Sequence, residues 1–589
     1  RQRIDSEEVP QVRAAALRAW CALGETEVVE QVTPYLHDTD QDIRLGAMVG
    51  LLRYGGIEGV LAAGEQLILA AHAAEPARRI FAAQGLGEVG IQSFYQPLVA
   101  LLHDADPAVR RTAVTAAGKI QNPKLWPLVL DHLLAPDVGT AAVSALVAGG
   151  ASVLPELAAA FNKPGQDRGT LVRMARICGR IRGERAIALL QEHIDIPDVA
   201  VRNCVLVALG LCGYRAQDGG LEFIQQQIAQ EVGEATWTLA ALTDIGEGDA
   251  IVLLQTALHH ELDAIRRRLF LLLSFIYERQ SIQRAWENLA HASTENRAYA
   301  LEIIDVLLPL DLKTMLLALI DDLSPAQRLD RLTERFPQSS LERSPRLEEI
   351  VTRPGTWTHP WTRACALYAM AKLDTFTAAG SDVVVASLSN PEPLIRESAL
   401  WALEQLDPTA CRRYARELYN DPSPQVARIL RHLTTEEEGH EIMLTTIEKV
   451  LILKTVNIFT EVPDEILAEV ASLLDEVELS PGETVFEKGD VANCLYIIVG
   501  GTVRVHDGEY TIRHLGARDL FGELALLDAE PRSASITATD DTRLFRLDQD
   551  AFYELMADRI EVARGIIRVL CQQVRAVTAS ARQDSTNTA

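Results

Sequence analysis

The stretch VRRTAVTAAGKIQ, from Val109 to Gln121, repeats apolar residues with the period of an α-helix, so that they share one face. Similar stretches recur about every 30 residues along the first three quarters of the chain, which is the signature of a repeat architecture. A second helix, such as residues 126–135, fits in the rest of each period. One helix pair cannot bury its apolar face alone, whereas a stack of pairs can. The sequence therefore predicts an α-solenoid. The clearest copies begin at Val12, Ile43, Val109, Val201, Ile265 and Ile395.

An arginine stands second in most copies, and an acidic residue with a proline often precedes it, which marks a helix start. We expect these arginines to cap or cross-link neighbouring repeats rather than to bind a ligand. Weaker copies at Gly139, Val172 and Ala235 keep the phase. The phase breaks between Pro309 and Pro360, where FPQSSLERSP predicts a loop or an irregular insertion. The anchor arginines are Arg13, Arg44, Arg79, Arg110, Arg202, Arg266, Arg297, Arg363 and Arg396.

This pattern resembles the HEAT-like repeats, whose motif D-P-x-V-R-x-x-A-x-x-A-L-G is well kept at Asp106 and Asp198. The resemblance covers roughly residues 9–435. It implies a solenoid over residues 1–435 whose surface binds a protein partner.

The last quarter of the chain changes from helical to β-type patterns. We expect connecting helices within residues 436–477 and then short strands with glycine turns over residues 478–580, where closing helices end the domain. Asp507-Gly508 lies between two alternating runs and predicts a two-residue hairpin. Strands at this spacing indicate a small barrel or roll. The fold class is therefore mostly α, an α-solenoid followed by a small β-roll, with a disordered polar tail over residues 581–589.

One segment of the β-type region, FGELALLDAEPRSASI (Phe521–Ile536), has the residues of an anion site. Gly522 and Glu523 open a short predicted helix, whose first amides have no internal partner and can bind an anion. Arg532 follows nine residues later and can form a fork on the same anion. A carboxylate at Glu523 suits a hydroxyl beside that anion. An anion with a neighbouring hydroxyl is what a phosphorylated ribose offers.

This segment and its surroundings, PGETVFEKGD and LYIIVGGTVRV, resemble the cyclic-nucleotide-binding domain family of the catabolite activator protein and the protein kinase A regulatory subunits. The resemblance covers about residues 450–578. It implies that Glu523 binds the ribose 2′-hydroxyl and Arg532 the cyclic phosphate. The rest of the cradle would come from Gly522, Leu524, Ala525 and Ser533.

The resemblance implies cyclic AMP as the ligand, with cyclic GMP as the alternative, and no cofactor. One departure lies beside the site: Arg518 in LGARDLFGE stands where the family has a glycine. The alternative interpretation is a degenerate domain that keeps the fold as a structural scaffold and binds nothing.

An enzyme is not expected, because the sequence holds no GxSxG, HExxH or P-loop lysine motif. The net charge of −26 disfavours nucleic acid as a partner. The longest apolar run, residues 269–277, is too short to span a membrane. The phrases at residues 266–277 and 446–459 resemble the soluble tails of bacterial ATP/ADP-translocase-like or major-facilitator-like membrane proteins. We therefore expect a cytoplasmic regulatory module, at the cytoplasmic side of a membrane if a transporter part is attached.

Three apparent sites are discounted. GLGEVG (Gly85–Gly90) fits a dinucleotide motif but ends a repeat helix. His259 and His260 have no matching metal ligands at helical spacing and are interpreted as a solvated pair. The eight cysteines form no CxxC pair and are interpreted as buried free thiols in a reducing compartment.

Overall fold

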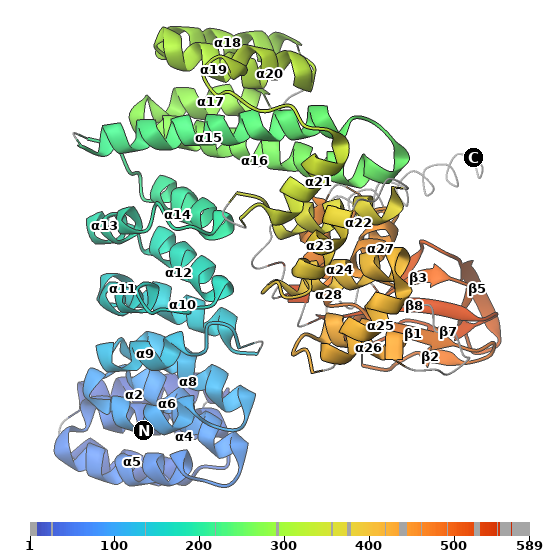
Figure 1. Cartoon of the computed structure of the whole chain (residues 1–589). Coiled ribbons are helices and arrows are strands. Elements are labelled where there is room, and N and C mark those ends of the chain that lie inside the picture. The colour runs from blue at the N-terminus through green and yellow to red at the C-terminus, as the bar shows by residue number, and fades with distance from the viewer. Residues whose placement is uncertain are drawn as a thin grey trace, which may run out of the picture. The chain divides into compact units, whose positions relative to one another are not determined.

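The computed structural model confirms a mostly helical chain that ends in a β-rich domain (Figure 1). It divides into two compact units, Arg1–Ile196 with Ala200–Tyr214, and Pro197–Val199 with Arg215–Ala589. The structure describes residues 9–24, 27–135, 137–217, 219–289, 294–354, 357–373, 378–418, 420–434, 444–460, 462–491, 493–522, 531–549, 552–553, 556 and 567.

The first unit consists of helix pairs in two layers. Even-numbered helices pack on each other in succession from α2 to α12, and the odd-numbered helices from α3 to α13 form the second layer. The helices are α2 (Pro10–Leu23), α3 (Glu27–Val32), α4 (Gln41–Tyr54), α5 (Gly56–Ala71), α6 (Pro76–Val89), α7 (Gln96–Leu102), α8 (Pro107–Ile120), α9 (Trp126–Leu130), α10 (Gly139–Gly149), α11 (Leu154–Phe161), α12 (Arg168–Ile181), α13 (Glu184–Glu192) and α14 (Val199–Leu211).

Glycines let successive helices of the first layer approach closely. A Cβ on Gly118 would lie 2.8 Å from Cα of Ala145, and one on Gly179 would lie 2.9 Å from Cα of Ala208. Gly87, inside the discounted GLGEVG motif, faces Ala116 in the same way at 3.0 Å. Gly87 therefore serves helix packing near the end of α6, and Gly90 caps that helix in the left-handed conformation at φ 63°.

Arg110 and Arg79 illustrate the two predicted roles of the anchor arginines, which are capping and cross-linking. Arg110 donates from Nη1 to the carbonyls of Asp104 and Ala105, in the turn before its own helix. Arg79 makes the same turn contacts and also donates from Nε and Nη2 to both carboxylate oxygens of Asp104 in the next repeat. The hydrogen bond from Arg79 holds the pKa of Asp104 below its usual value, so this contact is kept at neutral pH.

The second unit opens with two long antiparallel helices, α15 and α16, joined by a buried bidentate ion pair between Arg268 and Glu231. The helices of this unit are α15 (Gly219–Ile245), α16 (Val252–Ile276), α17 (Arg279–Leu289), α18 (Thr294–Leu307), α19 (Leu310–Ile320), α20 (Pro325–Thr333), α21 (Arg343–Thr352), α22 (Pro360–Lys372), α23 (Ala378–Ser387), α24 (Pro393–Leu406), α25 (Pro408–Glu417), α26 (Pro424–Thr434), α27 (Thr446–Leu453) and α28 (Asp464–Ser472).

The loop expected at FPQSSLERSP is confirmed at residues 336–342, between α20 and α21, while the rest of the region between Pro309 and Pro360 is mostly helical, with α19, α20 and α21 inside it. One sequence expectation needs correction here. The helix expected up to Val477 stops at Ser472, and β1 begins at Asp475, because Val477 pairs with Leu544 of β8. The tertiary pairing overrides the local helical period.

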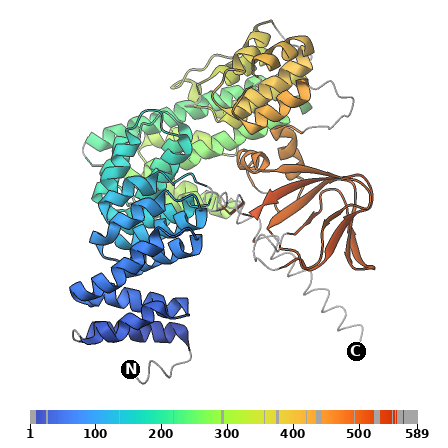
Figure 2. The same ribbon diagram turned by 90° about the horizontal axis from the view of Figure 1, so that it is seen from below.

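The strands form a compact group at the red end of the colour scale (Figure 2). One sheet has the order β1-β8-β3-β6 and the other β2-β7-β4-β5. The predicted hairpin joins β4 and β5, but its two loop residues are Gly508, at φ 59°, and Glu509 rather than Asp507 and Gly508, because Asp507 pairs with Tyr510. The strands are β1 (Asp475–Leu479), β2 (Thr484–Phe486), β3 (Cys494–Gly500), β4 (Val503–Asp507), β5 (Tyr510–Leu515), β6 (Leu520–Phe521), β7 (Ser535–Ala538) and β8 (Thr542–Asp548).

Strand β3 is buried on both faces. Cys494, Tyr496 and Ile498 belong to the apolar core inside the roll. Leu495 and Ile497 belong to a second core that also contains residues of α24, α27 and α28. This strand therefore lies between the interior of the roll and the core that it shares with α24, α27 and α28.

Within the described residues no single helix is long and apolar enough to cross a bilayer; one pair bent by 111°, Gly139–Ser152 with Leu154–Phe161, passes on length and composition alone. The described cysteines are free thiols and most are buried, and burial raises the pKa of Cys21 to about 11. Cys571 lies outside the described residues.

Candidate ligand-binding site

Arg532, one of the two residues that decide the sequence interpretation, lies inside the roll with only 7% of its surface exposed. Its backbone is held against the turn between β2 and β3. The Arg532 amide donates to the carbonyl of Asp490 at 2.9 Å, and its carbonyl accepts from the amide of Gly489 at 2.8 Å. These two bonds fix the direction in which the side chain enters the roll.

The guanidinium of Arg532 is only partly satisfied by the protein. Nη2 donates to the carbonyl of Cys494 at 2.7 Å and lies 3.6 Å from its Sγ, and Cζ lies 4.0 Å above the ring of Phe486. Nε and Nη1 are buried and have no hydrogen-bond partner among the described residues. A buried charge with unpaired donors is costly, so these two donors, unpaired among the described residues, can bind an anion.

Gly522 lies beside this guanidinium, as the sequence predicted. A Cβ at this position would collide with Nη1 of Arg532 and would lie 3.1 Å from the carbonyl of Cys494. The backbone is also left-handed, at φ 80°, a conformation that glycine adopts without strain. The left-handed backbone and the nearby carbonyl of Cys494 therefore both favour glycine at this position.

The remaining predicted residues fall into two groups. Ser533 is described and exposed, next to Arg532. Glu523, Leu524 and Ala525 lie outside the described residues, and so does most of the predicted closing region 559–580. The structure therefore places Gly522 against Arg532, with Ser533 next in the chain, and it tests none of the six assigned binding roles.

Sequence reasoning missed Phe486 and Cys494, which contact Arg532 from β2 and β3. Only the strand register could have revealed the contact of Phe486, because Phe486 pairs with Ile536, which follows Arg532 by four residues. Arg518, the departure noted in the sequence, is one of the described non-glycine residues with positive φ, at 78°. The backbone there keeps the left-handed conformation that glycine favours, at a steric cost to arginine.

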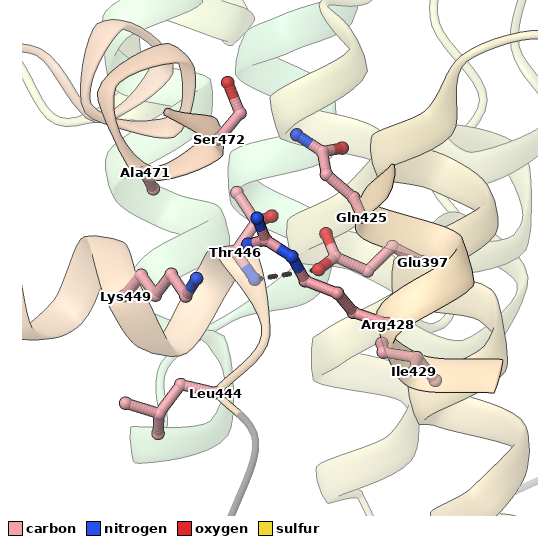
Figure 3. A pocket seen from close by; sticks show the side chains of 9 residues that line it. All are labelled: Glu397, Gln425, Arg428, Ile429, Leu444, Thr446, Lys449, Ala471 and Ser472. Carbon is pink, nitrogen blue, oxygen red and sulfur yellow. Dashed lines mark hydrogen bonds between the residues drawn. The ribbon is translucent and has the colours of Figure 1, made fainter. Parts of the chain in front are cut away.

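A second polar cluster lies where α24 and α26 meet α27 and α28. It surrounds a hollow of about 10 Å³, enough for roughly one water molecule (Figure 3). Oε1 of Glu397 in α24 accepts from the amide of Thr446, the first residue of α27, at 3.1 Å. Burial raises the pKa of Glu397, and its Oε2 has no hydrogen-bond partner in the described part of the chain.

Two further contacts cross the same junction. Arg428 of α26 donates to the carbonyl of Leu474 at 3.3 Å. Nδ1 of His260 in α16 lies 3.3 Å from Oε2 of Glu465 in α28, and the interaction with this carboxylate raises the pKa of His260. The solvated histidine pair expected from the sequence is therefore wrong for His260. Among the described residues no group of three or more His, Cys, Asp or Glu side chains could hold a metal.

The model of the cyclic nucleotide-binding domain matches residues 476–559, and the model of HEAT repeats matches residues 64–147. The CRP-like cAMP-activated global transcriptional regulator of Mycobacterium tuberculosis is 35% identical over 129 residues, 21% of this chain and 58% of the relative. The cAMP-dependent protein kinase regulatory subunit of Colletotrichum orbiculare is 35% identical over 91 residues, 15% of this chain and 23% of the relative. The structure of the Thermus thermophilus catabolite activator protein is 28% identical with a TM-score of 0.21, and the match covers 22% of this chain and 63% of that one.

Each match covers only part of this chain. The matched region spans 58% of the first curated relative and 23% of the second, which is less than two thirds of either. The chain thus has HEAT repeats in its N-terminal part and a C-terminal cyclic nucleotide-binding domain related to CRP and to the regulatory subunits of protein kinase A.

Proposed function

We propose that the roll binds one cyclic mononucleotide per chain and that the helical repeats pass the binding event to a protein partner. The observation that carries the proposal is the buried guanidinium of Arg532, whose Nε and Nη1 lack partners among the described residues. A cyclic phosphate carries one negative charge and two free oxygens, which suits a guanidinium fork. Glu523 then binds the ribose 2′-hydroxyl, and Leu524, Ala525 and Ser533 complete the cradle.

Cyclic AMP is the proposed ligand, because the curated relatives with this domain are named for cAMP. A titration with cAMP and cGMP in competition tests this preference. We expect saturable binding with one site per chain, and stronger binding of cAMP. A preference for cGMP of about tenfold, roughly 1.4 kcal/mol, would reverse the assignment of the base. An absence of binding by both would leave the scaffold alternative.

The proposed route of the signal starts at β3. Its inward residues Cys494 and Tyr496 lie on the side of Arg532, and its outward residues Leu495 and Ile497 pack in one core with α27 and α24. A ligand that pulls Arg532 away from the Cys494 carbonyl therefore acts on a strand whose other face touches the connecting helices. Such a ligand can shift the equilibrium only by its differential affinity, commonly about 1–3 kcal/mol.

Glu397→Ala is expected to weaken this transmission without weakening ligand binding. The substitution removes the acceptor for the Thr446 amide and so frees the first turn of α27 from α24. We expect the affinity for cAMP to stay within about threefold, a change of less than 1 kcal/mol. Hydrogen exchange should show that the cAMP-induced change in α24 is lost.

Glu404→Ala, on the same helix α24, is the matched control and should keep the exchange change. If Glu397→Ala also keeps it, then the contact between Glu397 and Thr446 does not carry the signal.

The role we propose is regulatory and not enzymatic. No catalytic residue is assigned, and the protein partner binds the surface of the repeats. Attachment to a transporter-like membrane part, on its cytoplasmic side, is a further hypothesis that rests on the sequence resemblance alone.

A further inference from the structure

We propose that Phe486 is a positioning residue for the phosphate-binding arginine, a role that rests on the proposed function. Its ring lies under the guanidinium of Arg532, with 4.0 Å between Cζ and the ring centroid. A cation over an aromatic face is attracted by the negative face of the ring. Phe486 therefore holds the guanidinium of Arg532 before the ligand binds to it.

Phe486 is itself held by two further rings. Its centroid lies 6.0 Å from that of Tyr496 and 5.9 Å from that of Phe521. Tyr496 and Phe521 stack on each other at 5.2 Å with an interplanar angle of 15°. We call Phe486, Tyr496 and Phe521 the aromatic platform. Because the rings restrain one another, the platform can restrain the guanidinium without a charged partner.

Among the described residues no carboxylate contacts the guanidinium of Arg532, and this matters for binding. A carboxylate on Arg532 would occupy its donors and compete with a phosphate. The described contacts of the guanidinium instead involve the ring of Phe486 and the carbonyl and Sγ of Cys494, which leave Nε and Nη1 unpaired in the described part of the roll. The platform thus orients the arginine and keeps its charge available to an anion.

The position of Phe486 follows from the register of the second sheet. Phe486 ends β2 and pairs with Ile536 of β7, and Arg532 lies just before β7. The amide of Lys488 also donates to Oγ of Ser535 at 3.0 Å. The turn after β2 is thereby tied to the segment that carries Arg532, so the ring and the guanidinium are held together by backbone geometry.

The test is a double-mutant cycle on cAMP affinity in the full chain, with Phe486→Leu and Arg532→Ala. Loss of the cation–π contact predicts about 2- to 30-fold weaker binding in Phe486→Leu. Phe486→Tyr keeps the aromatic face and should stay within about threefold of wild type. In the Arg532→Ala background, Phe486→Leu should cause no further loss, because its effect acts through the arginine.

Phe545→Leu is the matched control. Phe545 is fully buried in β8, but it belongs to the core on the outer side of β3 and not to the aromatic platform. The Phe545→Leu variant should be less stable than wild type and should keep the wild-type affinity for cAMP. Phe486→Met repeats the test with a flexible side chain of similar volume if Phe486→Leu melts below the assay temperature.

Three results would overturn the inference. Equal affinity of wild type and Phe486→Leu removes the role of the ring. An equal loss in the Arg532→Ala background assigns the effect to general packing and not to the arginine. If wild type binds neither cAMP nor cGMP, the proposed function fails, and the positioning role fails with it; the first two results leave the proposed function intact.

Discussion

Arg532→Ala is expected to weaken cAMP binding about 10- to 150-fold, because a lost charge-assisted contact costs about 1.5–3 kcal/mol. The ligand-free chain should melt at nearly the same temperature as wild type. The substitution removes the contacts with Phe486 and Cys494, but it also removes a buried charge with two donors that lack partners among the described residues. Arg532→Ala should therefore lose affinity for cAMP while it keeps nearly the wild-type melting temperature.

Thermal melts with ligand make the difference measurable. At a cAMP concentration of 100 times the wild-type Kd, wild type gains about 2.7 kcal/mol and the variant about 0.3–1.4 kcal/mol. Arg513→Ala, at an exposed arginine of β5 in the same domain, is the control and should behave as wild type. Wild-type affinity in Arg532→Ala would show that the assigned phosphate contact is wrong.

Arg268→Ala is expected to have the largest effect on stability, about 3–5 kcal/mol, because it leaves Glu231 buried and unpaired. Arg268 donates from Nε and Nη2 to the two carboxylate oxygens of Glu231 at 2.9 and 2.8 Å, and both side chains are almost fully buried. This pair joins α15 to α16, which open the second unit. Chemical denaturation should show the loss as a lower midpoint for that unit.

A double substitution separates the value of the pair from the cost of breaking it. Arg268→Met with Glu231→Leu removes both charges and keeps similar volumes, and such exchanges are often neutral or stabilising. We expect it to recover most of the loss. If the double variant is as unstable as Arg268→Ala, packing around the arginine and not its charge explains the effect.

The repeats could be predicted from the sequence because their signals are local. Asp106 caps α8 through the amides of Ala108 and Val109, and Pro107 occupies the first turn, so the motif itself starts the helix. The end of α28 could not be predicted, since β1 forms only by pairing with β8, far along the chain. Helices α19 to α21 were missed because they depart from the repeat phase on which the prediction rested.

The binding site likewise has residues that could be predicted from local sequence and residues that could not. Gly522 and Arg532 were found because they belong to one continuous segment, and the structure brings them together. Phe486 and Cys494 come from two other strands, and only the sheet register places them against the arginine. The junction contact between Glu397 and Thr446 spans 49 residues and likewise leaves no local signal in the sequence.

The central claim is that cyclic-nucleotide binding in the roll changes the conformation or dynamics of α24 to α26. Hydrogen exchange of the wild-type chain with and without saturating cAMP tests it most directly. We predict changed protection at residues 522–535, in the closing region 559–580, at residues 446–462 and in α24 to α26, fading before the middle repeats. A change confined to residues 522–535 would contradict the claim and leave the roll a passive binder.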